Sequence, residues 1–255
     1  MPKVVDDSQH RQHSLSDWLT LHELDPASCR RTLDAMTREA AGRPATREGS
    51  SAAYRAPELE IAWRRTVDAM RAFLPEHRNI IDDTFENTAR IAVDRTDKPG
   101  KAVTIDNGPA AYPTILFSYR GEPSDFLIVA HEFGHALQLR ASQGRFVPPI
   151  MREVCAFLSE GALLSETRRN DPARHVYLSR AWRDDNRRYF GAQRDRLRAA
   201  LPRLDTPYAY SWNYPVARYA ASQIAARCSQ YRIWSIFEGK TSLRDILREF
   251  ALSST

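Results

Sequence analysis

Residues 125–139 carry an H-E-x-x-H motif within a run that has the periodicity of an amphipathic helix. His131 and His135 are four residues apart, so on a helix they share one face and can bring two imidazole nitrogens to one metal ion. Glu132 points about 100° further around the helix, beside the ion rather than onto it, where a carboxylate can take a proton from a zinc-bound water. The motif therefore predicts a zinc (Zn2+) site with Glu132 as general base.

The same run predicts how this helix packs and where it begins and ends. Apolar side chains recur at spacings of three and four, opposite the histidines: Phe126, Val129, Ala130, Phe133, Ala136 and Leu137. Ser124 is a favourable N-cap and Asp125 suits the helix dipole, so we expect the helix to begin near Asp125. It should end before Gly144, because Pro148 and Pro149 prevent simple continuation. The alternative is an ordinary amphipathic helix whose histidines are surface or core residues.

A second predicted helix, residues 151–166, supplies candidates for a third ligand, since a catalytic zinc usually has three protein ligands and one water. Glu153 and Glu160 are seven residues apart and therefore share a face of this helix. Glu153 follows His135 by 18 residues (153 − 135), enough for a turn and a return on an antiparallel helix, and is the preferred third ligand. Glu160 could accept a hydrogen bond from the other ring nitrogen of a ligand histidine. The alternative for both glutamates is a solvated helix face.

Residues 111–138, followed by the run E-V-C-A-F-L-S-E that begins at Glu153, resemble the catalytic core of the thimet oligopeptidase and oligoendopeptidase F family. In that family a strand and a short turn lead into H-E-F-G-H, and a later helix carries two glutamates seven apart, of which the first binds zinc. The resemblance implies the same base and the same three zinc ligands, with oligopeptides as substrates. Residues 99–101 also resemble the glycine-lysine segment that precedes the family's substrate-binding strands, and the similarity is strongest over residues 95–165.

Three features depart from the family pattern. The interval between His135 and Glu153 is shorter than usual, and the chain is far shorter than a typical member. No histidine follows His175, so the role of the family's substrate-contacting histidine is vacant. The tyrosines of residues 207–222 do match and imply a hydrogen-bond donor for the oxyanion of the reaction; the candidates are Tyr210 and Tyr214, with Tyr208 third. Alternatively, these rings simply pack between helices.

Composition excludes several other classes of protein. A chain of 255 residues with 42% hydrophobic content is ordinary for a soluble globular protein. The N-terminus lacks a signal-peptide core and no run of 18 apolar residues suggests a membrane span, so we expect a soluble protein. Cys29, Cys155 and Cys228 are odd in number and widely spaced, which argues against a disulfide framework and favours a cytoplasmic location. The net charge of +5 comes mainly from arginines interleaved with aspartates, which does not indicate a nucleic-acid-binding surface.

We expect residues 15–255 to form one mainly α-helical domain, preceded by a loose N-terminus at residues 1–14. A small β-sheet should lie beside the H-E-F-G-H helix, with strands at residues 102–105 and 114–119. The second strand could offer an exposed edge to an extended peptide, or the two strands could form a simple structural hairpin.

The remaining periodic segments predict further helices, and prolines mark several of their ends. These helices are residues 17–24, 25–42, 57–75, 80–91, 172–200 and 208–237, and a last helix that begins at Ser242. Pro215 marks either a kink or the true start of the helix in which it lies.

The predicted function is zinc-dependent hydrolysis of peptide bonds in short peptides. The alternative is a zinc enzyme that acts on one small amide or ester in a biosynthetic pathway without general peptidase activity, which the short chain and the vacant histidine role favour. A binding module with a structural zinc is a third reading, although such sites usually close with a fourth protein ligand. The expected partner is a short peptide or small amide, not nucleic acid or a membrane, and the sequence does not predict the oligomeric state.

Overall fold

The computed structural model describes residues 13–41, 58–93 and 102–252 and shows a mainly α-helical protein with a small mixed β-sheet, as the sequence predicted. Several predicted features lie outside the described residues: the N-terminus up to residue 12, the helix start at Pro57 and the glycine-lysine segment 99–101. Within the described part of the chain, no helix combines the length and the hydropathy needed to span a bilayer.

The part of the chain before the sheet contains four of the predicted helices. Their bounds are α1 (Leu15–Leu21), α2 (Pro26–Ala41), α3 (Leu59–Phe73) and α4 (Arg78–Asn87), with a 3-10 turn (Pro75–His77) before α4. Two residues of the N-terminus that was predicted to be loose are held in place. Ser14 caps α1, accepting a hydrogen bond from the backbone N–H of Asp17, and the carbonyl of His13 accepts one from the N–H of Tyr208 at 2.7 Å.

The H-E-F-G-H helix is α5 (Pro123–Ser142), which begins slightly earlier than predicted. Its N-cap is Glu122 and not Ser124, because a proline occupies the first helical position, where no backbone N–H is needed. Asp125 still stabilises the start of the helix, since its carboxylate accepts a hydrogen bond from the backbone N–H of Glu122 at 3.2 Å. The prediction that Ser124 caps the helix is therefore wrong, because the N-cap lies two residues earlier, just before Pro123.

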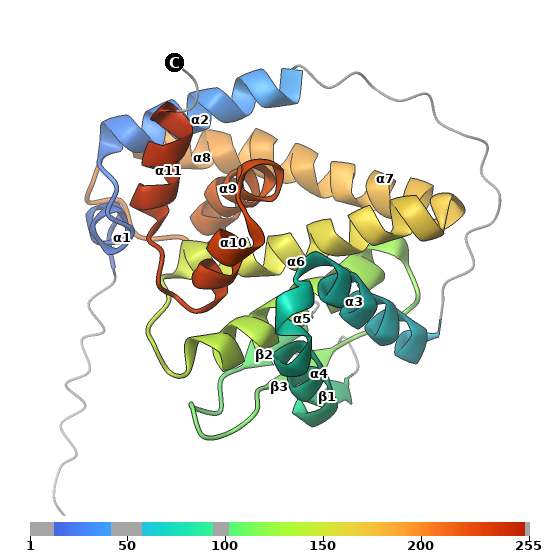
Figure 1. The fold of residues 1–255 in the computed structure, drawn as a ribbon. Coiled ribbons are helices and arrows are strands. Elements are labelled where there is room, and N and C mark those ends of the chain that lie inside the picture. Colours follow the sequence, from blue (N-terminus) through green and yellow to red (C-terminus); the bar gives the residue numbers. More distant parts are fainter. Residues whose placement is uncertain (1–12, 42–57, 94–101, 253–255) are drawn as a thin grey trace, which may run out of the picture.

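The long helix α6 (Pro149–Asn170) returns along α5 after a short turn, in which Gln143 and Gly144 have positive φ angles of 51° and 78°. All six apolar residues of the stripe predicted on α5 are at most 2% exposed, so this face of the helix is core. Helix α6 also packs against α3 and against helices of the C-terminal half, and it runs through the middle of the molecule (Figure 1). The two predicted active-site helices are therefore the centre of the fold.

The sheet has three strands, β1 (Ala89–Ala92), β2 (Ala102–Ile105) and β3 (Thr114–Phe117), in the order β1-β3-β2. β3 is parallel to β1 and antiparallel to β2. Two expectations are corrected. Residues 89–91 are a strand and not the end of a helix, because they pair with β3, a partner that local periodicity cannot reveal. The second predicted strand is central rather than an exposed edge, and the strand at the edge beside α5 is β2.

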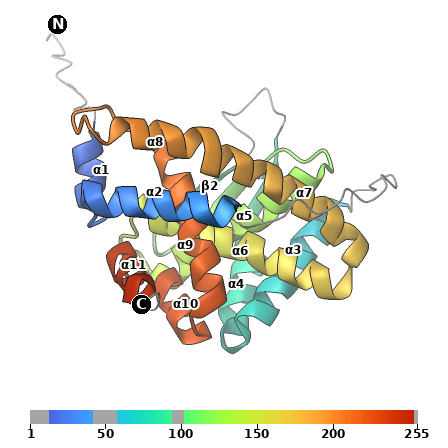
Figure 2. The same cartoon turned by 90° about the horizontal axis from the view of Figure 1, so that it is seen from above.

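The C-terminal half packs over α6. Helices α7 (Pro172–Arg188) and α8 (Arg194–Ala200), joined by a π-helical turn (Tyr189–Gln193), form the nearly continuous rod that was predicted for residues 172–200 (Figure 2). The helix predicted at residues 208–237 is instead a 3-10 turn followed by α9 (Asn213–Arg227) and α10 (Gln230–Phe237).

The break between α9 and α10 has a local cause. Cys228 adopts an extended conformation, with ψ of 148°, and the side chain of Ser229 accepts a hydrogen bond from the N–H of Arg232, which starts a new helix. Pro215 lies in the first turn of α9 and marks its start, one of the two predicted alternatives. The last helix, α11 (Leu243–Leu252), begins as predicted, with Ser242 accepting from the N–H of Asp245.

Candidate active site

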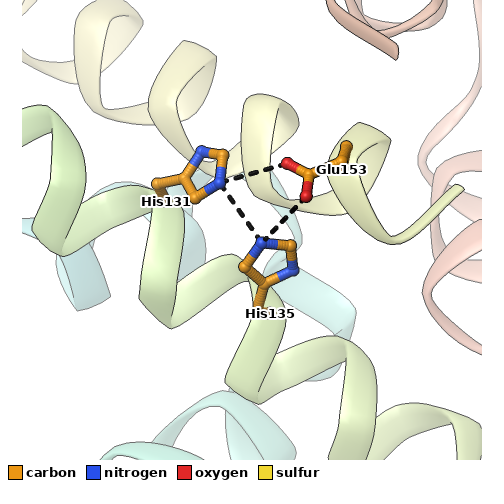
Figure 3. Close-up of side chains that lie close together, drawn as sticks. All are labelled: His131, His135 and Glu153. Carbon is orange, nitrogen blue, oxygen red and sulfur yellow. Dashed lines mark hydrogen bonds and ion pairs between the residues drawn. The ribbon is translucent and has the colours of Figure 1, made fainter. Parts of the chain in front are cut away.

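Two histidines of α5 and one glutamate of α6 point toward one another (Figure 3). Nε2 of His131 lies 3.2 Å from Nε2 of His135 and 3.2 Å from Oε2 of Glu153. Nε2 of His135 lies 3.8 Å from Oε1 of Glu153. One ligand atom from each side chain can be chosen so that all lie within 4.8 Å of one another. The structure therefore brings together the three residues that the sequence suggested as metal ligands.

Gly134, between the two histidines, allows α5 and α6 to approach closely. A Cβ atom built on Gly134 would lie 2.7 Å from the Cα of Ala156 and 2.8 Å from the carbonyl oxygen of Cys155. A side chain at this position would push α6 away from α5, and Glu153 lies one turn before Ala156 on that helix. The contact at Gly134 therefore sets the distance between the histidines and the glutamate.

Glu160 lies two turns after Glu153 and contacts the outer side of the cluster. Its Oε1 accepts a hydrogen bond from Nδ1 of His131 at 2.8 Å. This bond directs the Nε2 atom of the neutral ring toward His135 and Glu153, because the proton of the neutral imidazole is held on Nδ1. The position of Glu160 is the one that the seven-residue spacing suggested.

Arg218 of α9 completes this arrangement, and no motif pointed to it. Its side chain is 1% exposed, and Nη1 donates a hydrogen bond to Oε2 of Glu160. The guanidinium also lies over the rings of Trp182 and Phe157, at 4.1 and 4.6 Å from the ring centroids, and its Nε donates to Asn186. A buried charge pair of this kind holds Glu160 ionised and fixed in place.

Glu132 lies beside the cluster and not in it. Its side chain is 6% exposed, and the hydroxyl of Thr104 donates a hydrogen bond to Oε2 of Glu132 at 2.6 Å. Thr104 belongs to β2, so the edge strand of the sheet positions this carboxylate, a link that the sequence did not reveal. Glu132, His131, His135 and Glu153 all line one cavity of about 270 Å³.

Two of the three candidate tyrosines also line this cavity. The hydroxyl of Tyr210 donates a hydrogen bond to Oε1 of Glu153 at 2.7 Å. The hydroxyl of Tyr214 has no hydrogen-bond partner among the described residues, and burial followed by the charge of Glu153 raises the pKa of Tyr214. Tyr208 does not line the cavity, and its hydroxyl accepts a hydrogen bond from Asn213. Tyr214 is therefore the tyrosine whose hydroxyl can donate to a molecule in the cavity.

Burial and charge act in opposite directions on the cluster. Burial disfavours a proton on His131, but the nearby carboxylates of Glu153 and Glu160 outweigh burial and hold the pKa of His131 well above its usual 6.5. Burial lowers the pKa of His135. Burial alone would raise the pKa of Glu153, but the two histidines outweigh it and lower this pKa. The cluster thus retains a fixed negative charge that attracts one cation, a proton or a metal ion.

The donor set fits a zinc ion. Two imidazole nitrogens and a carboxylate oxygen are ligands that zinc commonly takes in catalytic sites. Two nitrogens bonded to one tetrahedral zinc at about 2.0–2.1 Å are roughly 3.3 Å apart, and the Nε2 atoms of His131 and His135 are 3.2 Å apart. Oε2 of Glu153 is buried and has no hydrogen-bond partner among the described residues, as expected for a ligand atom.

Comparisons with known proteins give a likeness of fold. No protein-family model matches this chain, and no curated protein matches it. Among solved structures, the fold resembles that of a "putative peptidase from Chlamydophila abortus", with a TM-score of 0.63 and 12% sequence identity over 94% of this chain and 53% of that one. At this identity the likeness shows the fold alone.

Two further structures are less similar. They are a "putative oligoendopeptidase F from Bacillus anthracis str. Ames" (TM-score 0.46, 13% identity, 92% of this chain and 51% of that one) and a "putative lipoprotein from Colwellia psychrerythraea" (TM-score 0.44, 12% identity, 94% and 55%). The chain spans about half the length of the solved structures that it matches.

Proposed function

We propose that this protein is a zinc-dependent peptidase that hydrolyses peptide bonds in short peptides. The observation that carries this proposal is the position of Glu132, which shares one cavity with the cluster of His131, His135 and Glu153 but lies outside the cluster itself. A carboxylate beside the ion, rather than bound to it, is what a general base requires. The fold that the chain shares with the Chlamydophila abortus protein is consistent with this function.

His131, His135 and Glu153 would hold the zinc ion, with Glu160 fixing the orientation of His131. Bound there, zinc supplies a Lewis acid that polarises a carbonyl oxygen and lowers the pKa of a water molecule to about 7. The buried charge of Arg218 would keep Glu160 ionised through the reaction.

Glu132 would take the proton of the attacking water and then deliver it to the nitrogen of the leaving amine. The hydrogen bond from Thr104 to Oε2 holds the carboxylate in position, and Oε1 of Glu132 has no hydrogen-bond partner among the described residues. One oxygen is therefore anchored while the other can exchange the proton.

Tyr214 would donate a hydrogen bond to the oxygen on which negative charge develops. Its hydroxyl is available in the cavity and stays protonated, because its pKa is raised, first by burial and then by Glu153. Tyr210 would act on the ligand instead, since its hydroxyl already donates to Glu153. A donor that forms its hydrogen bond to the oxyanion in the transition state contributes about 3 to 4 kcal/mol to catalysis.

An extended peptide fits along β2. Ala102, Val103 and Thr104 line the cavity, and β2 lies at the edge of the described sheet. Main-chain hydrogen bonds to such an edge give affinity without reading the side chains. A cavity of about 270 Å³ is near the lower end of ligand pockets, which measure roughly 300–1,000 Å³, and it favours a short peptide over a folded protein.

A panel of short quenched fluorescent peptides tests the proposal. We expect cleavage by the purified protein, loss of cleavage when a chelator removes the metal, and recovery when zinc is added. The small cavity also favours the second candidate, a zinc enzyme specific for one small amide or ester. Absence of cleavage of every peptide by fully zinc-loaded protein would contradict the peptidase and support this alternative.

A further inference from the structure

A second cavity, of about 310 Å³, opens directly beside the active-site cavity. It lies between the loop that precedes β3 and the turn that joins α5 to α6, at residues 106–113 and 144–147. Four residues line both cavities and mark where they join: Asp106, Gln138, Leu139 and Arg152. A substrate that lies over the metal cluster therefore has room to extend past these residues.

Arg152 is the residue at this junction that can bind an anion. Its Nε donates a hydrogen bond to the carbonyl of Val147 at 3.0 Å, which fixes the plane of the guanidinium. Neither Nη atom has a hydrogen-bond or ion-pair partner among the described residues. The charge of Arg152 also acts on the active site. Burial and the charge of Glu153 raise the pKa of Tyr210, and the charge of Arg152 acts in the opposite direction.

The two cavities differ in charge. The active-site cavity contains the carboxylates of Glu132 and Glu153, whereas the second cavity contains Arg145 in addition to Arg152. Asp106, the acidic residue that lines both, is exposed and accepts a backbone hydrogen bond, so solvent screens its charge. A carboxylate on the substrate is therefore attracted to Arg152, at the junction of the two cavities.

Gln138 supplies a second polar group at the junction. It lies one turn after His135 on α5 and is 1% exposed, yet its Oε1 has no hydrogen-bond partner among the described residues. A buried amide oxygen is normally paired, so an N–H of a bound ligand would satisfy it. Gln138 and Arg152 together offer an acceptor for an N–H and donors for a carboxylate, which are the two main-chain groups of a peptide's last residue.

We infer that Arg152 and Gln138 bind the C-terminal residue of the substrate, with Arg152 paired to the α-carboxylate and Gln138 accepting the N–H. The inference rests on the proposed peptidase function and adds a specificity to it. The protein selects peptides by their free C-terminus and cuts close to it, because the second cavity adjoins the metal cluster. An acidic side chain carries the same carboxylate chemistry and is the other source to be distinguished.

Matched peptides test this subsite. One sequence is prepared as the free acid, as the C-terminal amide, and as an amide whose last residue is glutamate, and kcat/KM is measured with zinc-loaded protein. The wild type should prefer the free acid over the amide by about tenfold or more, as expected for a hydrogen-bonded charged group. Arg152→Gln should remove this preference and Arg152→Lys should keep part of it. Arg244→Gln is the control, since Arg244 is exposed on α11 and lines neither cavity.

Each outcome separates the subsite from the catalytic proposal. Equal cleavage of acid and amide, or a preference that survives Arg152→Gln, overturns the subsite and leaves the peptidase intact. Cleavage of the glutamate amide as fast as the free acid overturns the assignment to the C-terminus. If no peptide is cleaved, the peptidase proposal fails, and calorimetric titration then tests the subsite: equal affinity of acid and amide overturns it, whereas tighter binding of the acid that Arg152→Gln abolishes supports it.

Discussion

Gly134 of α5 faces Ala156 of α6 so closely that a Cβ atom on the glycine would lie 2.7 Å from the Cα of the alanine. Backbone cannot give way as a flexible side chain can, so any substitution must move one helix. Because the two histidines flank Gly134 and Glu153 precedes Ala156 on α6, the movement would separate the candidate ligands. The stability of the fold and the geometry of the candidate metal site therefore depend on the same contact.

Gly134→Ala should lower the free energy of unfolding by about 1–3 kcal/mol through overpacking, and should weaken zinc binding. Gly161→Ala is the matched control, because Gly161 lies in α6 and a Cβ there meets nothing within 4 Å. The control should be neutral or stabilising by up to about 1 kcal/mol, since alanine is the better helix former. Urea unfolding and zinc titration of both variants measure these changes in stability and in zinc affinity. If Gly134→Ala is as stable as Gly161→Ala, the two helices can move apart without cost and the close contact does not matter.

The two cavity tyrosines should respond differently to loss of the hydroxyl. Tyr214→Phe should lower kcat by about 100-fold with little change in KM, because its hydrogen bond forms mainly in the transition state. Tyr210→Phe should instead weaken zinc binding by about tenfold, since its hydroxyl donates to the candidate ligand Glu153. Tyr231→Phe, at an exposed surface position, is the control. Full kcat in both single variants and in the double variant would mean that these rings only pack.

Arg218→Met should lower the free energy of unfolding by about 3 kcal/mol or more, because it leaves the buried Glu160 without its charge partner. Zinc affinity should fall as well, since Glu160 would no longer orient His131 firmly. Adding Glu160→Gln should restore part of the stability by removing the unpaired charge. The control is Arg187→Met, whose pair with Asp184 is exposed and which should change stability by less than about 0.5 kcal/mol. Similar effects of the two arginine substitutions would contradict a buried network.

His22 should make the protein less stable in mild acid. Its ring is 2% exposed, and burial, followed by the charge of Arg152, lowers the pKa of His22 from 6.5 to about 4. Between these values the unfolded chain binds a proton that the folded protein does not, so stability is complete above pH 6.5 and falls as pH drops toward 4. The loss amounts to about 1.4 kcal/mol for each pH unit, or on the order of 3 kcal/mol in total.

Denaturant unfolding across this pH range, compared with His22→Leu, isolates the effect. The unfolding free energy of the wild type should fall relative to that of the variant as the pH drops from 6.5 toward 4, because the variant has no group to titrate at this position. Parallel pH curves for the two proteins would show that His22 is not held neutral by burial.

Local signals in the sequence were sufficient for the helices at the centre of the fold. The apolar stripe predicted α5, and the spacing of Glu153 and Glu160 predicted which face of α6 meets it. β1 was missed because its partner, β3, lies about 25 residues further along the chain. The local pattern of apolar residues does not show which distant segment a strand pairs with. The break after α9 was missed because neither glycine nor proline marks it; the serine cap at position 229 was the available signal.

The candidate site divides in the same way. A motif of five residues indicated His131, Glu132 and His135, since one helix turn fixes their relation. Thr104 and Arg218 contact Glu132 and Glu160 across separations of 28 and 58 residues, and only tertiary packing creates those contacts. Tyr210 and Tyr214 also differ for a reason that only the fold reveals. The hydroxyl of Tyr210 donates a hydrogen bond to Glu153, whereas that of Tyr214 does not.

Zinc content and turnover, measured together on the wild type and on Glu132→Gln, separate the role of a general base from that of a metal ligand. If Glu132 is the base and His131, His135 and Glu153 are the ligands, both proteins should contain about one zinc ion per chain, as expected for a three-ligand site. Only the wild type should cleave peptides. A wild type without bound zinc would rule out a zinc enzyme, and a Glu132→Gln variant that retains full turnover would rule out Glu132 as the base.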